Sequence, residues 1–202
     1  SSGLTGTMLD VASYRLATHL TFACIIFAYV LWLARGRADD HYDGAGRLAR
    51  WGGVMMVLLI LSQIALGGLV AGMDAGLAYN TWPLMDGALV PAGLFAMEPG
   101  WLNFFENIKT VQFTHRTTAI AVLVAALAYA LLLSAKAYDA DGKRMANSAW
   151  VVAILVVFQA MIGVGTLLLA VPFDWALAHQ GGAVVLLAAA VVHTRATMAP
   201  AN

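Results

Sequence analysis

Apolar residues gather in five long runs along the chain, separated by shorter polar stretches. The runs cover 14–34, 51–72, 112–134, 149–171 and 175–192. About 20 apolar residues are enough for an α-helix to cross the hydrocarbon core of a bilayer. Because lipid offers no hydrogen-bond partner to a bare backbone, each run is expected to be helical. The pattern therefore predicts an all-α integral membrane protein, a bundle of five transmembrane helices.

Lysines and arginines between the runs divide the connections into two kinds. Two connections are basic, and together they carry Arg35, Arg37, Arg47, Arg50, Lys136, Lys143 and Arg144. The long connection (73–110) holds four carboxylates against the single Lys109, and the turn at 172–174 has no positive charge. Since basic loops are retained in the cytoplasm, these two connections are predicted inside. The N-terminus is then outside and the C-terminus inside.

The amino-acid composition is typical of a membrane protein and argues against several other classes of protein. Hydrophobic residues make up 61% of the chain and charged residues 11%, whereas a soluble domain carries about 25% charged residues. No basic patch suggests nucleic acid as a partner, and the single Cys24 excludes an internal disulfide or thiolate cluster. The opening Ser1-Ser2-Gly3 is unlike a signal peptide and typical of a loop, so the chain is expected to be a fragment that lacks its beginning.

Two histidines mark the openings of the third and fifth runs. His115 lies in TVQFTHRTT (110–118) and His179 in WALAHQ (175–180). A histidine inside a membrane helix is costly unless something uses it. Two imidazoles at the same depth suggest one object held between them, and a haem iron accepts imidazole on both axial faces. His115 and His179 are therefore the predicted iron ligands.

The other histidines have different surroundings. His19 lies at a similar depth from the outer end of the first run. His41 is predicted to be a surface residue of a cytoplasmic connection. His193 follows His179 by 14 residues, roughly 21 Å along a helix axis, so it cannot share a ligand with His179. It is predicted to be an interfacial residue whose side chain snorkels toward water.

A weak internal repeat precedes both histidine-bearing runs. The second run ends in QIALGG (63–68), and the fourth contains QAMIGVG (159–165). The glycines allow close approach of helices or leave room for a flat macrocycle, and the sequence keeps both readings open. The long connection carries many aromatic residues and a predicted short helix at 101–107; these are interfacial belt residues or a lid over the outer end.

Several of these segments together resemble the haem A synthase family. They are GGLVAGMDAGLAYNTWPLMDG (67–87), VQFTHR (111–116), ALAHQ (176–180) and SYRLATHL (13–20). Members have eight helices in two pseudo-symmetric halves. The resemblance implies that 1–50 is the fourth family helix with a cytoplasmic linker, and that 51–202 is the C-terminal, pseudo-symmetric four-helix half that binds haem b.

The resemblance also implies roles for individual residues. His115 and His179 match the ligand pair of a resident haem b, whereas His19 matches a ligand of the substrate haem. The partner of His19 and a catalytic glutamate would lie in the absent N-terminal part. In this half, Gln112 stands three residues before His115, the place equivalent to that of the glutamate before its histidine. A neutral amide suits a site that holds haem. Arg116 is expected to pair with a haem propionate or with a lipid phosphate.

The implied activity is that of an oxidoreductase that converts haem O to haem A for cytochrome oxidase. Haem O would be supplied by a haem O synthase, and the electron donor is unidentified. The protein could form a homo-oligomer. The fragment alone is expected to be inactive. The surroundings are membrane lipid, in a bacterial inner membrane rather than a mitochondrial one. A b-type cytochrome that only transfers electrons is the alternative. A proton-relay transporter would need carboxylates inside the runs, and the sequence has none there.

Overall fold

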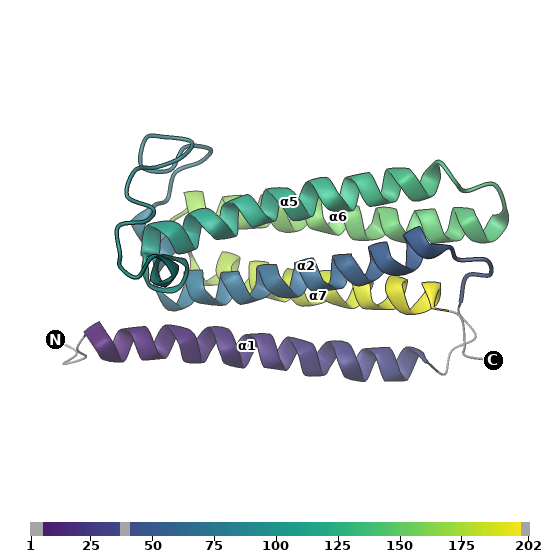
Figure 1. Cartoon of the computed structure of the whole chain (residues 1–202), viewed down its shortest axis with the longest axis horizontal. Coiled ribbons are helices and arrows are strands. Elements are labelled where there is room, and N and C mark those ends of the chain that lie inside the picture. Colours follow the sequence, from purple (N-terminus) through teal and green to yellow (C-terminus); the bar gives the residue numbers. More distant parts are fainter. Residues whose placement is uncertain (1–5, 37–40, 199–202) are drawn as a thin grey trace.

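The computed structural model consists of five long helices and a few short ones. It describes residues 6–36 and 41–198, with side chains from residue 13 onward; Ser1–Thr5 and Arg37 lie outside the described residues. The long helices are α1 (Gly6–Arg35), α2 (Arg47–Gly72), α5 (Ile108–Ser134), α6 (Ala140–Leu168) and α7 (Phe173–Thr197). Each is long and apolar enough to cross a membrane (Figure 1). The predicted all-α membrane bundle is confirmed.

Four of the helices form a closed ring, and α1 lies outside it. Around the ring, α2 packs on α5, α5 on α6, α6 on α7 and α7 on α2, while α1 packs on α2 and α7 (Figure 1). Consequently α5 and α7 lie diagonally opposite, as do α2 and α6. The two predicted basic connections lie at one end of the bundle and the other two at the opposite end. Which end faces the cytoplasm, and the division into 1–50 and 51–202, stay predictions.

Polar caps explain why two helices begin before the apolar runs. The side chain of Asp139 accepts a hydrogen bond of 2.6 Å from the backbone N–H of Gly142 and so starts α6 in the polar connection. Asn107 caps α5 in the same way, accepting from the N–H groups of Lys109 and Thr110. A capping oxygen satisfies backbone donors that have no partner within the helix. The short helix predicted at 101–107 is present as η1 (Gly100–Leu102) and α4 (Asn103–Glu106).

His193 is buried within the bundle, so its predicted interfacial position is wrong. Only 3% of the residue is exposed. Its Nε2 lies 2.8 Å from the hydroxyl of Tyr129, and its Nδ1 lies 2.6 Å from that of Ser148. Tyr42 donates to Ser148, and Tyr129 also donates to the carbonyl of Ala49. Because both ring nitrogens have partners, burial costs little here. His41, in contrast, is half-exposed, 3.5 Å from Asp43, which confirms its prediction as a surface residue.

Replacement of Tyr129 by phenylalanine should destabilise this end of the bundle. The change leaves His193 Nε2 and the Ala49 carbonyl without the hydroxyl that contacts both, and interhelical hydrogen bonds in membranes are worth about 0.6 to 1.7 kcal/mol. We expect a lower melting temperature in detergent, measured by the loss of helical circular dichroism. Tyr138→Phe is the control, since Tyr138 is 88% exposed. Equal melting of the two variants would contradict a stabilising role for the network.

Candidate functional site

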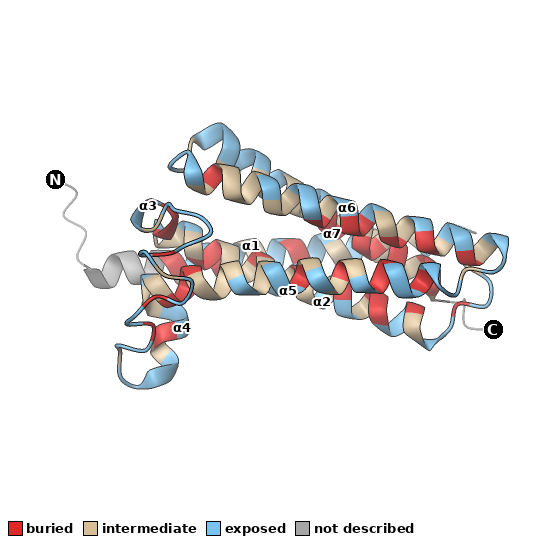
Figure 2. Cartoon of the chain, turned by 90° about the horizontal axis from the view of Figure 1, so that it is seen from above, coloured by how far each residue is buried: buried red, intermediate tan, exposed pale blue. Residues whose placement is uncertain are grey.

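The two ends of the bundle are packed differently. Buried residues gather toward the end where α7 stops, whereas the other ends of α6 and α7 are mostly half-buried or exposed (Figure 2). In the described part of the chain, no side chain is buried at 113–121 of α5, 157–165 of α6 or 173–185 of α7. Each segment exceeds two turns and so includes positions that face inward. Side chains of α5, α6 and α7 at this depth are therefore less covered than those at the other end of the ring.

His115 lies at this depth and is held by residues of α2. The side-chain nitrogen of Gln63 lies 3.1 Å from His115 Nδ1 and 3.4 Å from Nε2, and it donates to the His115 carbonyl at 3.0 Å. One helical turn further along α2, a Cβ added to Gly67 would lie 3.3 Å from His115 Cε1. The imidazole is therefore bracketed by an amide and by a glycine.

His179 has the same surroundings on the opposite side of the ring. The side-chain nitrogen of Gln159, on α6, lies 3.1 Å from His179 Nδ1 and donates to the His179 carbonyl at 2.5 Å. A Cβ added to Gly163 would lie only 2.6 Å from His179 Cε1. The spacing from glutamine to glycine is the same as in α2. The two glutamine–histidine pairs are thus equivalent, as the pseudo-symmetry inferred from the repeat requires.

The glycines of the repeat have two kinds of neighbour, and only close helix approach, one of the two readings of the sequence, is seen directly. Gly67 and Gly163 face the imidazoles, whereas Gly68 allows close approach of α1, where an added Cβ would lie 2.8 Å from Ala17 Cα. Helices α5 and α7 are diagonal, so their histidines can address one ligand from two sides. Within the described residues, no three histidines, cysteines or carboxylates gather as a metal site. The pair suits a flat ligand whose metal needs only two axial protein ligands.

Gln112 and Arg116 lie on the same side of α5 as the long connection. Gln112 is 2% exposed and donates to the Tyr79 carbonyl at 2.9 Å. The terminal nitrogens of Arg116 donate to the carbonyls of Thr81 and Tyr79 at 2.8 and 2.7 Å, and its guanidinium lies over the Trp82 ring. The Nε of Arg116 is buried and has no partner in the described structure. The Nε–H of Arg116 is therefore a buried donor that an anionic group could accept from.

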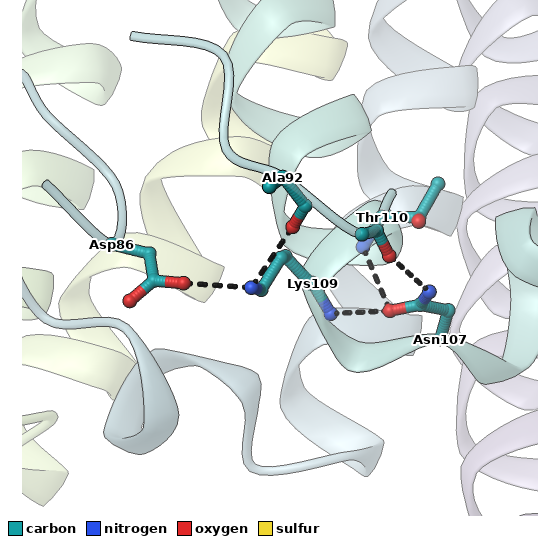
Figure 3. A network of polar contacts seen from close by, with 6 residues as sticks. Asp86, Ala92, Asn107, Lys109 and Thr110 are labelled. Carbon is teal, nitrogen blue, oxygen red and sulfur yellow. Dashed lines mark hydrogen bonds and ion pairs between the residues drawn. The ribbon is translucent and has the colours of Figure 1, made fainter. Parts of the chain in front are cut away.

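The long connection is fastened to the start of α5 (Figure 3). Lys109 Nζ donates to Asp86 Oδ2 at 2.7 Å and to the Ala92 carbonyl at 3.0 Å. The hydroxyl of Thr110 donates to the Leu94 carbonyl, and the side chain of Asn107 donates to the Gly93 carbonyl at 3.1 Å. The connection thus folds back over the same end of the bundle as the two histidines. Its role as a lid stays a prediction.

His19 is not brought to the other two histidines. It is exposed on α1, while Ser13 and Ala17 of the same helix pack against glycines of α2. Its imidazole therefore belongs to a different face of the molecule. This is compatible with its expected place in a separate site, which stays a prediction.

The sequence as a whole matches one protein family. Residues 1–191 match the family described as COX15-CtaA, cytochrome oxidase assembly protein. The chain belongs to this family. Its relatives in the COX15-CtaA family include proteins named Heme A synthase. The one from Allorhizobium ampelinum is 50% identical over 196 residues, 96% of this chain and 53% of the relative.

Other members of the COX15-CtaA family give the same picture. The Heme A synthase of Chelativorans sp. is 51% identical over 98% of this chain and 54% of the relative. That of Rhizobium meliloti is 49% identical over 96% of this chain and 52% of the relative. The chain thus spans about half the length of the curated relatives it matches. No solved structure matches the chain.

Gln63 and Gln159 are the site residues that sequence reasoning did not assign. Both belong to the repeat, QIALGG and QAMIGVG, so a signal was present. Their contacts with His115 and His179 depend on which helices become neighbours, and the repeat alone does not specify this.

Proposed function

We propose that this chain is the part of a haem A synthase that holds a resident haem b and contributes to the substrate site. The observation that carries the proposal is the pair of equivalent glutamine–histidine contacts on diagonal helices, at a depth where the side chains of α5, α6 and α7 are only partly covered. The relatives named Heme A synthase, about 50% identical over nearly the whole chain, support the same activity. The activity is oxidation of the C8 methyl of haem O to a formyl group.

His115 and His179 would bind the iron of haem b from its two faces, and that iron would supply redox chemistry. Arg116 would offer its buried Nε–H to a propionate, because guanidinium groups pair well with carboxylates. Gln112 would keep the backbone of Tyr79 in place for Arg116, since both donate to the same carbonyl. The long connection would limit the access of water from the outer end. His19 would bind the substrate haem O on the exposed face of α1.

A chimera tests the proposed function. This 202-residue segment replaces the matching segment of the Chelativorans relative, in a host without its own haem A synthase. Extraction and chromatography of haem should detect haem A from the chimera. A stable, haem-loaded chimera that makes no haem A would contradict the proposal.

Two variants of the chimera separate the two sites. His19→Ala should keep the haem b spectrum and lose haem A, because His19 belongs to the substrate site. If His19→Ala makes haem A normally, His19 has no role in the substrate site. That result would favour the alternative in which this chain only transfers electrons, as a b-type cytochrome does. The segment expressed alone should hold haem b without making haem A, since no second histidine or buried carboxylate accompanies His19 among the described residues.

We also propose a bacterial inner-membrane location with the long connection on the outer side, since the opposite connections are basic. Leu89, which is 70% exposed, and Asp43, whose side chain is 86% exposed, report the two sides. In a Cys24→Ala background, Leu89→Cys should react with an impermeant maleimide in intact cells, and Asp43→Cys only after lysis. The reverse pattern would invert the topology.

A further inference from the structure

Two glutamines next to the histidines have no role in the function proposed above. Gln63 and Gln159 approach their histidines in the same manner. In both pairs the side-chain nitrogen lies 3.1 Å from Nδ1 of the histidine and also donates to the backbone carbonyl of that histidine. The contact comes from a different helix in each case. The contacts with Nδ1 and with the backbone carbonyl thus recur in both halves of the ring, and the Gln63 nitrogen additionally lies 3.4 Å from His115 Nε2.

We propose that Gln63 and Gln159 are positioning residues, each of which fixes the rotation of one imidazole so that Nε2 is presented to the iron. This inference rests on the proposed haem b site. The hydrogen bond to the carbonyl anchors the carboxamide beside the histidine backbone. From that anchor the amide reaches Nδ1, the nitrogen that must find a partner when Nε2 binds a metal. The ring is then held by both of its nitrogens.

A carboxamide suits this task better than a hydroxyl or an apolar side chain. It has a donor at one end and an acceptor at the other. In the structure its nitrogen serves an unprotonated Nδ1 and the histidine carbonyl. When Nε2 binds a metal, the amide would turn over and give up the bond to the carbonyl, and its oxygen would then accept from Nδ1–H. The oxygen of Gln63 is buried with no partner in the described part of the structure. A buried acceptor without a partner costs about 1–3 kcal/mol, so an Nδ1–H group facing it would remove that cost.

Glycines complete the restraint on each ring. Gly67 and Gly163 lie one turn beyond the glutamines, close to Cε1 of the histidines. The oxygen of Gln159 in turn lies against Gly182, where an added Cβ would be 2.4 Å away. A side chain at position 182 would therefore displace the amide from its place beside the imidazole. Positioning by both glutamines would set the angle between the two imidazole planes.

The experiment uses the full 202-residue chain, purified and titrated with haem b. Gln63→Leu and Gln159→Leu remove the amide, and Ser62→Ala is the matched control, because Ser62 is exposed and bonds only to its own helix at Leu58. Loss of an outer partner of a metal-binding histidine typically costs 10- to 100-fold in affinity. We expect that weakening for both leucine variants and none for the control.

Two further readouts separate positioning from a merely structural contact between helices. Electron paramagnetic resonance of the oxidised haem reports the angle between the imidazole planes, and it should change in both leucine variants. Loss of the acceptor at Nδ1 makes the imidazole a weaker donor, so the midpoint potential should rise. A tenfold change in the reduction equilibrium corresponds to 59 mV for one electron. Gln63→Glu and Gln159→Glu keep an acceptor of the same length and should lower the potential.

The outcomes are distinct. Leucine variants that bind haem b with wild-type affinity, potential and resonance spectrum would overturn the positioning role. Should the leucine variants not fold, an unchanged potential in both glutamate variants would overturn it equally. If the unmodified chain binds no haem b through its two histidines, the proposed function itself fails. If the unmodified chain binds haem b and the glutamine substitutions change neither affinity, potential nor resonance spectrum, the positioning role alone is wrong.

Discussion

Replacement of His115 or His179 by alanine is expected to abolish low-spin haem b binding by the chain. Each imidazole is the only histidine that its helix places at this depth, and the described structure offers no third ligand nearby. Outer partners of ligating histidines alone are worth 10- to 100-fold in affinity, so loss of a ligand should exceed 100-fold or so. Reduced-minus-oxidised spectra of the purified variants measure the effect.

The matched control is His41→Ala, which removes a half-exposed histidine from a connection. It should retain the full haem signal. If His115→Ala and His179→Ala both keep a wild-type spectrum, the ligand pair is misassigned. Loss in one variant only would leave a single protein ligand, and the haem would not lie between α5 and α7.

The sequence predicted the helices well because length and polarity decide them. About 20 apolar residues in lipid can only be helical, and the five runs became five long helices. The depth of His115 and His179 could be counted from the helix ends for the same reason. Caps moved the boundaries outward, since Asp139 starts α6 in polar sequence.

The sequence did not predict contacts that depend on which helices become neighbours. His193 was expected at the interface because it lies too far along its helix to share a ligand with His179. In the structure, α5 and α6 supply Tyr129 and Ser148. Arg116 was expected to face a propionate or a phosphate. Two of its nitrogens instead bind carbonyls of the long connection, because that connection folds back over α5. The path of an irregular connection leaves no periodic pattern of apolar residues, so the sequence did not predict that it folds back.

Gly163→Ala should strongly weaken the binding of haem b, whereas Gly67→Ala should weaken it only mildly. The two glycines are equivalent in the repeat, but an added Cβ would lie 2.6 Å from His179 Cε1 and 3.3 Å from His115 Cε1. At the shorter distance the imidazole must rotate away from its position. At the longer one, a shift of a few tenths of an ångström is sufficient. Overpacking costs about 1–3 kcal/mol, which is roughly a 10- to 100-fold loss of affinity at Gly163.

Gly181→Ala is the control for this comparison, because nothing lies within 4 Å of the added Cβ. It lies two residues from His179 on the same helix, so it tests whether an alanine in α7 matters in itself. Haem b titrations of the three variants should therefore rank Gly181→Ala with the unmodified chain, Gly67→Ala slightly below it and Gly163→Ala far below. Equal affinities at Gly67 and Gly163 would show that the two imidazoles are not confined differently. The glycines would then act through helix packing rather than through the histidine rings.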